Sequence, residues 1–480
     1  MNLLRKLPVD EILARGQRGE LKRRLTATSL VGIGIGIIIG TGIFTLTGVE
    51  AKDHAGPGIV LSFLIGGVVA ALAALCYAEL SSAVPTAGSA YTYAYATMGE
   101  LLAWIIGWDL LLEFALGAAV NSRAWSGYIA NLLGLPTEYF GEDSAINLGA
   151  MAVVAALTCV AVIGIRGSSL VTNLLVVVKV AVCVLVIAAG IFFFQGANLH
   201  PFIPPAQAPT GSGDPSLVQV LFGVGKSVYG IGGVLTAAAV VFFAYTGFES
   251  LANLGEETRR PRRDLPVGLL GSLVVCTLLY IGVALVITAM VPYQSIDESA
   301  PIAAAFDAVG MPWISALVSL GALAGLTSVI MVELVTVGRI GYAMSRDGLL
   351  PAKLSQVHPR WSTPHRVTIG GGVVIMLLAG FVPLSDLADM VSIGALSGFL
   401  LVALSVPVLR RTRPELERPF RTPLSPVLPV VTALACLYLM LNLSVATWVR
   451  FVVWLAVGLL LYFLYGRRHS NLATGQVTGS

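Results

Sequence analysis

The chain has 480 residues, of which 56% are hydrophobic and 11% are charged, and its formal net charge is +3. A soluble domain usually carries about 25% charged residues, so this composition excludes a water-soluble globular protein. The long apolar runs fit instead the hydrocarbon core of a bilayer, about 30 Å thick, which a helix of about 20 apolar residues crosses. We therefore expect an all-α, polytopic membrane protein.

The chain begins with a basic segment that is too polar and too long for the charged region of a cleavable signal. We interpret residues 1–27 as a cytoplasmic tail. Its weakly amphipathic part, residues 7–25, would either lie along the lipid headgroups or remain an ordinary solvated tail.

Apolar runs separated by charged or Pro/Gly-rich breaks predict twelve transmembrane helices. These spans cover residues 28–51, 57–82, 97–131, 147–165, 169–194, 230–256, 266–290, 311–343, 367–382, 386–409, 424–443 and 448–466. A short helix is also expected at residues 299–308, in the long outer loop before span eight.

The distribution of charge tests the number of spans, because cytoplasmic loops of membrane proteins are enriched in Lys and Arg. With twelve spans, most of the 29 Lys and Arg residues fall in the two tails and the loops on one side. The opposite loops carry the acidic residues Glu138, Glu142, Asp143, Asp297, Glu298 and Asp307. A missed span would invert every later loop, so we predict a multi-pass plasma-membrane protein with both ends in the cytoplasm.

Two spans are interrupted near their centres. Span one is dense in glycine and contains Gly40-Thr41-Gly42, and span six contains Thr246-Gly247. Because glycine readily adopts conformations that break a helix, we expect both helices to be unwound there. Unwound backbone at that depth must face protein, water or a ligand rather than lipid.

Interrupted spans at equivalent places in two halves are typical of transporters built from inverted repeats. Because five spans, an odd number, separate the two breaks, the halves would lie inverted in the membrane. The predicted units are a first repeat of spans one to five, an extracellular loop, a second repeat of spans six to ten, two additional helices and a second cytoplasmic tail. They cover residues 28–194, 195–229, 230–409, 410–466 and 467–480.

Paired breaks offer a specific chemistry. The free N–H groups at the start of a half-helix suit a carboxylate, and exposed carbonyl groups suit an ammonium group, so the breaks would bind a zwitterion. The alternative is that the glycines only allow close packing of helices, as small residues do in many membrane proteins. The match between spans one and six favours the binding site.

The motifs along the chain resemble those of a known family, from about residue 25 to residue 470. They are Ile38-Ile39-Gly40-Thr41-Gly42-Ile43-Phe44, Tyr77-Ala78-Glu79-Leu80, Pro85-Thr86-Ala87-Gly88-Ser89-Ala90-Tyr91, Gly107-Trp108, Phe243-Ala244-Tyr245 with Gly247-Phe248-Glu249, and Arg339 with Ala343-Met344-Ser345-Arg346-Asp347-Gly348-Leu349-Leu350-Pro351. In these the chain resembles the cationic amino acid transporter family of the amino acid, polyamine and organocation superfamily. The resemblance implies a five-plus-five inverted repeat with broken helices one and six and two further helices.

The resemblance also implies roles for individual atoms at the breaks. The backbone N–H groups of Thr41 and Gly42 would receive the substrate carboxylate. The substrate amine would be received by carbonyl groups of Ile38, Phe243, Ala244 and Thr246.

Lys179 has only apolar neighbours in the sequence of span five, and an ionisable residue within a span is a functional candidate. Desolvation favours its neutral form, which suits a group that gains and loses a proton in each cycle. In relatives of the superfamily, a lysine at this place stands where sodium-dependent members bind the ion. Proton coupling is therefore the hypothesis, and a charged lysine that only ties span five to carbonyl groups of span one is the alternative.

Acidic residues within spans are the other candidates. The resemblance places Glu113 near the substrate, where it would orient an amine or gate the inner path. Glu333 departs from the family pattern, which has an apolar residue there. If Glu333 faces the pocket, its charge would favour a cationic side chain such as that of arginine, lysine or ornithine; otherwise it would pair with Arg123 or a hydroxyl group. For Glu79 and Glu249 we expect pairing with basic loops.

The function favoured by these features is secondary active, proton-coupled transport of L-amino acids by alternating access, with a leaning towards cationic substrates. Exchange of amino acids without proton coupling and non-transporting sensing of amino acids remain open. An enzyme is not expected, because the chain has no HExxH, GxSxG or P-loop motif. We expect no cofactor, metal site or nucleic acid; the predicted partners are the amino acid, the proton and membrane lipid, and no accessory subunit is identified. The cysteines are expected to be packing residues: Cys76, Cys159, Cys183, Cys276 and Cys436.

Overall fold

The computed structural model describes residues 25–474 except 84–90, 92–94, 96–98, 143, 165–168, 208–214, 224–227, 256 and 362. Most of the predicted first tail, with nearly all of its amphipathic part, and much of the 85–91 motif therefore lie outside the described residues.

Each of the twelve predicted spans coincides with helical structure in the described residues, which contain no β-strand. The long helices are α2 (Ala27–Ile38), α4 (Ile59–Ala83), α6 (Glu100–Leu133), α8 (Leu148–Ile163), α9 (Ser169–Gly190), α11 (Gly230–Val241), α12 (Pro261–Met290), α14 (Pro312–Arg346), α15 (His365–Phe381), α16 (Leu384–Thr412), α17 (Val427–Leu441) and α18 (Val445–Leu461). The short ones are α3 (Thr47–Glu50), α7 (Thr137–Phe140), α10 (Leu217–Phe222), α13 (Pro301–Ala308), α19 (Arg467–His469) and α20 (Asn471–Thr474). The short helix expected at 299–308 is thus confirmed as α13.

Eight helical stretches of the described chain are long and apolar enough to cross a membrane on their own. Four further apolar helices are shorter: α2, α8, α15 and α17. The first of these is one half of the broken span one, and the other three have 16, 17 and 15 residues. The all-α polytopic class is therefore confirmed.

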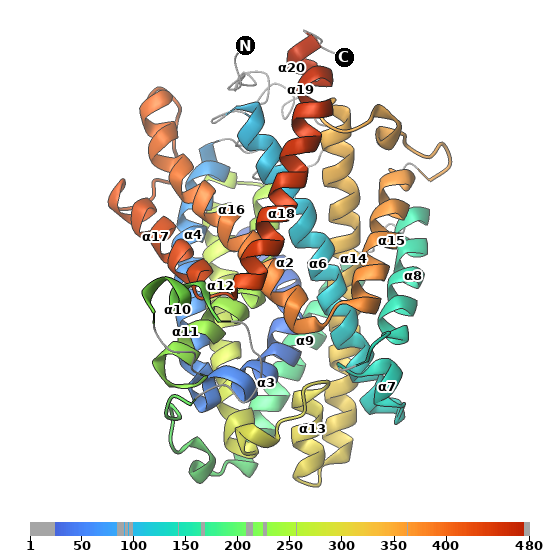
Figure 1. The fold of residues 1–480 in the computed structure, drawn as a ribbon, viewed down its shortest axis with the longest axis vertical. Helices are drawn as coiled ribbons and strands as arrows, with labels where there is room; N and C mark the ends of the chain where they lie inside the picture. Colours follow the sequence, from blue (N-terminus) through green and yellow to red (C-terminus); the bar gives the residue numbers. More distant parts are fainter. Residues whose placement is uncertain are drawn as a thin grey trace.

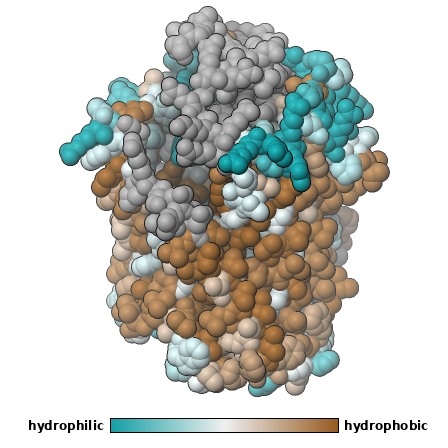
Figure 2. Space-filling view, turned by 180° about the vertical axis from the view of Figure 1, so that it is seen from behind, coloured by the Kyte–Doolittle hydropathy of each residue, from teal (hydrophilic) through white to brown (hydrophobic). Residues whose placement is uncertain are grey.

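The long helices run roughly along the long axis of the molecule, with α17 at one edge and α8 and α15 at the opposite edge (Figure 1). The most extensive packing is between α14 and α6, and α12 packs against both α4 and α2. On the face drawn in Figure 2, a broad apolar band covers the molecule, and hydrophilic residues gather at one end of it. This surface is the one expected of a protein that lies in a bilayer.

Both predicted breaks are confirmed. Helix α2 ends at Ile38, and Ile39 is extended, with φ −71° and ψ 104°. The chain becomes helical again at Gly42 and continues through α3 to Ala55. In span six, α11 passes into a 3-10 turn, after which Thr246 is extended and Gly247 has φ +97°, a value that favours glycine.

The predicted pairing of Glu79 with a basic loop is confirmed at the end of α4. Its carboxylate accepts hydrogen bonds from Arg410 Nε at 2.8 Å and Nη2 at 2.7 Å, and from the Thr422 backbone N–H at 2.8 Å. Because Glu79 is almost fully buried, these partners compensate the desolvation of its charge. The pair joins α4 to α16 and to the segment that follows it. All five cysteines are free, and all but Cys159 are buried.

Candidate functional site

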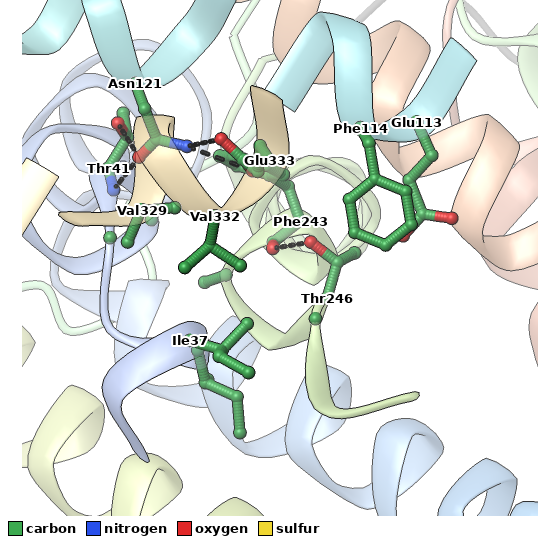
Figure 3. A pocket seen from close by; sticks show the side chains of 15 residues that line it. Ile37, Thr41, Glu113, Phe114, Asn121, Phe243, Thr246, Val329, Val332 and Glu333 are labelled. Carbon is green, nitrogen blue, oxygen red and sulfur yellow. Dashed lines mark hydrogen bonds between the residues drawn. The ribbon is translucent and has the colours of Figure 1, made fainter. Parts of the chain in front are cut away.

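A pocket lies where the two broken helices meet (Figure 3). It is lined by Ile37, Ile38, Gly40, Thr41, Gly42, Glu113, Phe114, Asn121, Phe243, Ala244, Thr246, Gly247, Val329, Val332 and Glu333. All eight residues that we predict to contact the substrate are among them, although they come from α2 and the second half of span one, α6, span six and α14. Their assignment to individual substrate groups stays a prediction.

At the end of the pocket where we predict the substrate carboxylate, the N–H groups of span one already donate hydrogen bonds within the protein. The Thr41 backbone N–H and hydroxyl both donate to Asn121 Oδ1, at 3.0 and 2.8 Å. Gly42 begins the second half-helix of span one, whose first N–H groups have no acceptor inside the helix. The Asn121 amide oxygen therefore occupies the place that we predict for an oxygen of the substrate carboxylate.

At the end predicted for the substrate amine, the expected acceptor carbonyls also accept hydrogen bonds within the protein. The Tyr280 hydroxyl lies 2.9 Å from Ile38 O and 3.0 Å from Ala244 O, so one side chain of α12 connects both breaks. Phe243 O accepts from the Thr246 N–H at 3.0 Å and from its hydroxyl at 2.9 Å. A carbonyl oxygen has two lone pairs, so Ile38 O and Ala244 O keep capacity for an ammonium group, whereas Phe243 O already accepts two hydrogen bonds.

The two breaks touch each other directly. An ideal Cβ atom built on Gly42 would lie 2.2 Å from Ala244 Cβ and 2.4 Å from Ala244 Cα. A Cβ on Gly40 would lie 2.9 Å from Asn121 Oδ1. Glycine is therefore required at position 42 so that span one can reach the backbone of span six.

Glu333 faces the pocket and is held there by Asn121 (Figure 3). The Asn121 Nδ2 group lies 3.1 and 3.3 Å from the two carboxylate oxygens of Glu333. Arg123, the other partner considered for Glu333, donates instead to the carbonyl oxygens of Val382 and Ser144. The Asn121 amide thus connects the break of span one to the carboxylate of α14.

Glu113 and Glu249 form a second polar pair. Their side chains lie near each other, and both are almost fully buried. Both oxygens of Glu249 also lie near the Gly247 N–H, at 2.9 and 3.0 Å. Our expectation that Glu249 pairs with a basic loop is therefore wrong, because the break turns its side chain inward, towards α6.

Lys179 lies outside the pocket lining and is fully buried between helices. Its Nζ donates to Gly36 O at 2.6 Å, and its methylene groups pack near Gly325 of α14. It is also within electrostatic reach of Glu333. Lys179 therefore connects α9 to α2, one turn before the break, and this contact fits both the proton-coupling hypothesis and its alternative.

The cavity has a volume of about 20 Å³. A single water molecule needs roughly 10–15 Å³ on this measure, so an amino acid does not fit without rearrangement. The structure therefore shows the site in a contracted arrangement. In it, Asn121, Tyr280 and Thr246 form hydrogen bonds with backbone groups of the two breaks. Within the described parts of the chain, no group of three or more His, Cys, Asp and Glu side chains is arranged to hold a metal ion.

Two residues that contact the breaks, Asn121 and Tyr280, were not predicted from the sequence. Asn121 is an amide within an apolar span, which is a recognisable signal of interhelical hydrogen bonding. Tyr280 gives no comparable signal, because a tyrosine within a long span is usually a packing residue. Its contact with Ile38 joins residues 242 positions apart, which only the fold brings together.

Comparison with known proteins agrees with this architecture. Residues 25–465 match the family model described as amino acid permease. The chain is 41% identical to a branched-chain amino acid permease of Bacillus subtilis, over 98% of this chain and 99% of that protein. It is 39% identical to a methylthioribose transporter of the same organism, with the same coverage of the two chains. It is 32% identical to the mitochondrial cationic amino acid transporter 3 of Arabidopsis thaliana, over 94% of this chain and 92% of that protein.

These relatives are named as permeases and transporters rather than enzymes, and the family model covers nearly the whole region over which the motifs resemble amino acid transporters. The chain is therefore a multi-pass membrane protein of the amino acid permease family.

Proposed function

We propose that this permease is a secondary active, proton-coupled transporter that takes up L-amino acids across the plasma membrane by alternating access, with both chain ends in the cytoplasm. The observation that carries the proposal is the single pocket at the meeting point of the two breaks. One end of it offers the N–H groups of Thr41 and Gly42 to a carboxylate, and the other offers carbonyl groups to an amine.

In the proposed cycle, the substrate carboxylate replaces Asn121 at the Thr41 N–H. Hydrogen bonds from N–H groups to a carboxylate are about twice as strong as those to a neutral amide, so the exchange is favourable. Because Asn121 also holds Glu333, its departure frees that carboxylate to meet the substrate side chain. Binding and the rearrangement of the site are thereby linked through one side chain.

Proton coupling is assigned to Lys179, which bonds to Gly36 O next to the break and lies near Glu333. A neutral amine would lose its attraction to Glu333 and would weaken its bond to Gly36. Loss of the proton would therefore loosen α2 from α9 and let the broken helices rock against the other helices.

The proposal is tested by uptake of radiolabelled arginine, leucine and alanine into proteoliposomes with an imposed pH gradient, acidic outside. We expect accumulation above the external concentration, abolished by a protonophore. Counterflow of amino acids that does not depend on the pH gradient would instead identify an exchanger. Absence of uptake by a folded, reconstituted protein would identify a sensor.

The preference for a cationic side chain rests on Glu333, which lines the pocket. A Glu333→Met variant removes the charge and should lower the ratio of arginine to leucine uptake by roughly tenfold, about 1.4 kcal/mol. Glu415→Met, which changes an exposed carboxylate in the loop after α16, should leave the ratio unchanged. Initial uptake rates of the two substrates measure the effect.

A second candidate is a neutral, branched-chain substrate. Ile37, Phe114, Val329 and Val332 line the same pocket, and one relative is named as a branched-chain amino acid permease. If Glu333→Met leaves the ratio of arginine to leucine uptake unchanged, the cationic preference is contradicted and the branched-chain candidate takes its place.

A further inference from the structure

An apolar groove lies on the surface of α12, near its first residue. Val267, Leu270 and Val274 are spaced three or four residues apart, so they share one face of the helix. Phe420, from the segment between α16 and α17, forms part of the opposite wall. The groove encloses about 750 Å³. Val267 and Val274 are 46% and 55% exposed, so no described part of the protein covers them.

Two arginines stand at the end of this groove. Arg262 and Arg263 both line it and are exposed. The guanidinium group of Arg262 donates to Glu417 at 2.8 Å through both terminal nitrogens, but this ion pair is largely exposed and therefore weak. Among the described residues, the Arg263 guanidinium has no hydrogen bond or ion pair. A planar guanidinium group matches the oxygens of a phosphate group.

The length of the groove corresponds to one leaflet of a bilayer. Val274 lies about three helical turns after Arg263, a rise of about 16 Å. The hydrocarbon core of a bilayer is about 30 Å thick, so half of it is about 15 Å. A lipid whose phosphate lies at the arginines would thus place its acyl chain along Val267 and Val274.

We propose that this groove is a binding site for one anionic phospholipid. Its phosphate lies at Arg263, with Arg262 beside it, and one acyl chain packs against Val267, Val274 and Phe420. A free phosphate ion would use only the arginines, and a zwitterionic lipid would bring a positive charge to them. An anionic lipid complements both the charge and the apolar wall.

The groove is connected to the transport machinery through the packing of α12 against α2. A Cβ atom on Gly268 would lie 2.6 Å from Leu30 Cβ, and one on Gly34 would lie 2.6 Å from Ser272 Oγ. Because the two helices are in such close contact, a lipid that holds the start of α12 at headgroup depth also positions α2, the inner half of the broken span one. This consequence rests on the proposed transport function, whereas the lipid site itself does not.

Lipid retention tests the site independently of transport. The protein is reconstituted in phosphatidylcholine with roughly one part in four of phosphatidylglycerol, re-extracted in mild detergent, and examined by native mass spectrometry. The wild type should retain one more phosphatidylglycerol molecule than a variant with Arg262→Ala and Arg263→Ala. A variant with Arg360→Ala and Arg366→Ala, two exposed arginines just before and at the start of α15, should behave as the wild type. Equal retention by the wild type and the first variant, or equal retention of phosphatidylcholine and phosphatidylglycerol, overturns the proposal.

A second variant tests the acyl chain. Val274→Trp fills the groove and leaves both arginines in place, so it should also lower the retention of phosphatidylglycerol. If only the arginine variant loses the lipid, an anion site without an acyl chain replaces the proposal.

Transport is then compared in vesicles with and without phosphatidylglycerol. Wild-type uptake should rise several-fold with the anionic lipid, and the variant with both Arg262→Ala and Arg263→Ala should show no such rise. If lipid retention follows the expectation but no vesicle shows uptake, the transport function fails and the lipid site stands.

Discussion

Replacement of Lys179 by arginine is expected to abolish the driving effect of a pH gradient on amino acid uptake. Arginine keeps a positive charge and hydrogen-bond donors for Gly36 O, but it does not lose its proton in proteins. If Lys179 carries the coupled proton, the ratio of uptake with and without the gradient should fall to about one. Counterflow of substrate between two equilibrated pools should persist, because the binding site is intact.

The alternative role of Lys179, a structural tie between α9 and α2, predicts a different result. In that case Lys179→Arg would keep its response to the gradient, and this outcome would contradict coupling through Lys179. Arginine is larger than lysine and the site is fully buried, so a second variant without added volume is needed. Lys179→Met, which removes the charge but keeps a long apolar side chain, serves this purpose. Lys353→Ala, at an exposed position before α15, is the control.

Gly42→Ala is expected to lower transport at least tenfold, because the added methyl group would overlap Ala244 of span six. The ideal Cβ atom would lie only 2.4 Å from Ala244 Cα, a main-chain atom that cannot move aside as a flexible side chain does. The two breaks would have to separate, which displaces the N–H groups and the carbonyl groups of the pocket relative to each other. Displacement of a site by about 1 Å is enough to lower activity by roughly 100-fold in enzymes.

Gly32→Ala is the matched control for this variant. It changes the same residue type in the same broken span, but no atom lies within 4 Å of the ideal Cβ at this position. Because alanine is favoured over glycine in a helix by about 1 kcal/mol, Gly32→Ala should transport normally and unfold at the same or a slightly higher temperature. Uptake and thermal unfolding in detergent are measured for both. Normal uptake by Gly42→Ala would refute direct contact between the two breaks.

Local sequence was sufficient to predict the spans and the breaks. The length and spacing of apolar runs report which segments cross a bilayer, because each helix must satisfy its backbone hydrogen bonds internally. The positions of glycine indicate where the helix is interrupted. For this reason α13 and both breaks lie where the sequence indicates, and the residues next to the breaks line the pocket. The division into repeats and the sidedness of the membrane stay predictions.

The contacts that complete the site were decided by the tertiary structure alone. Asn121 meets Thr41 across 80 positions of the chain, and Tyr280 meets Ile38 across 242. Glu249 turns towards Glu113 because of the conformation of its break, which no neighbouring residue in the sequence reveals.

The physical reason is the distance along the chain over which each effect acts. Hydrophobic length and glycine content act within one helix, and the sequence of that helix records them. The partner of a buried polar group depends on which helices pack together and on how each is rotated about its axis. The sequence therefore determined that this chain is a permease with two broken helices, whereas the packing of α6, α12 and α14 around the breaks decided which side chains occupy the site.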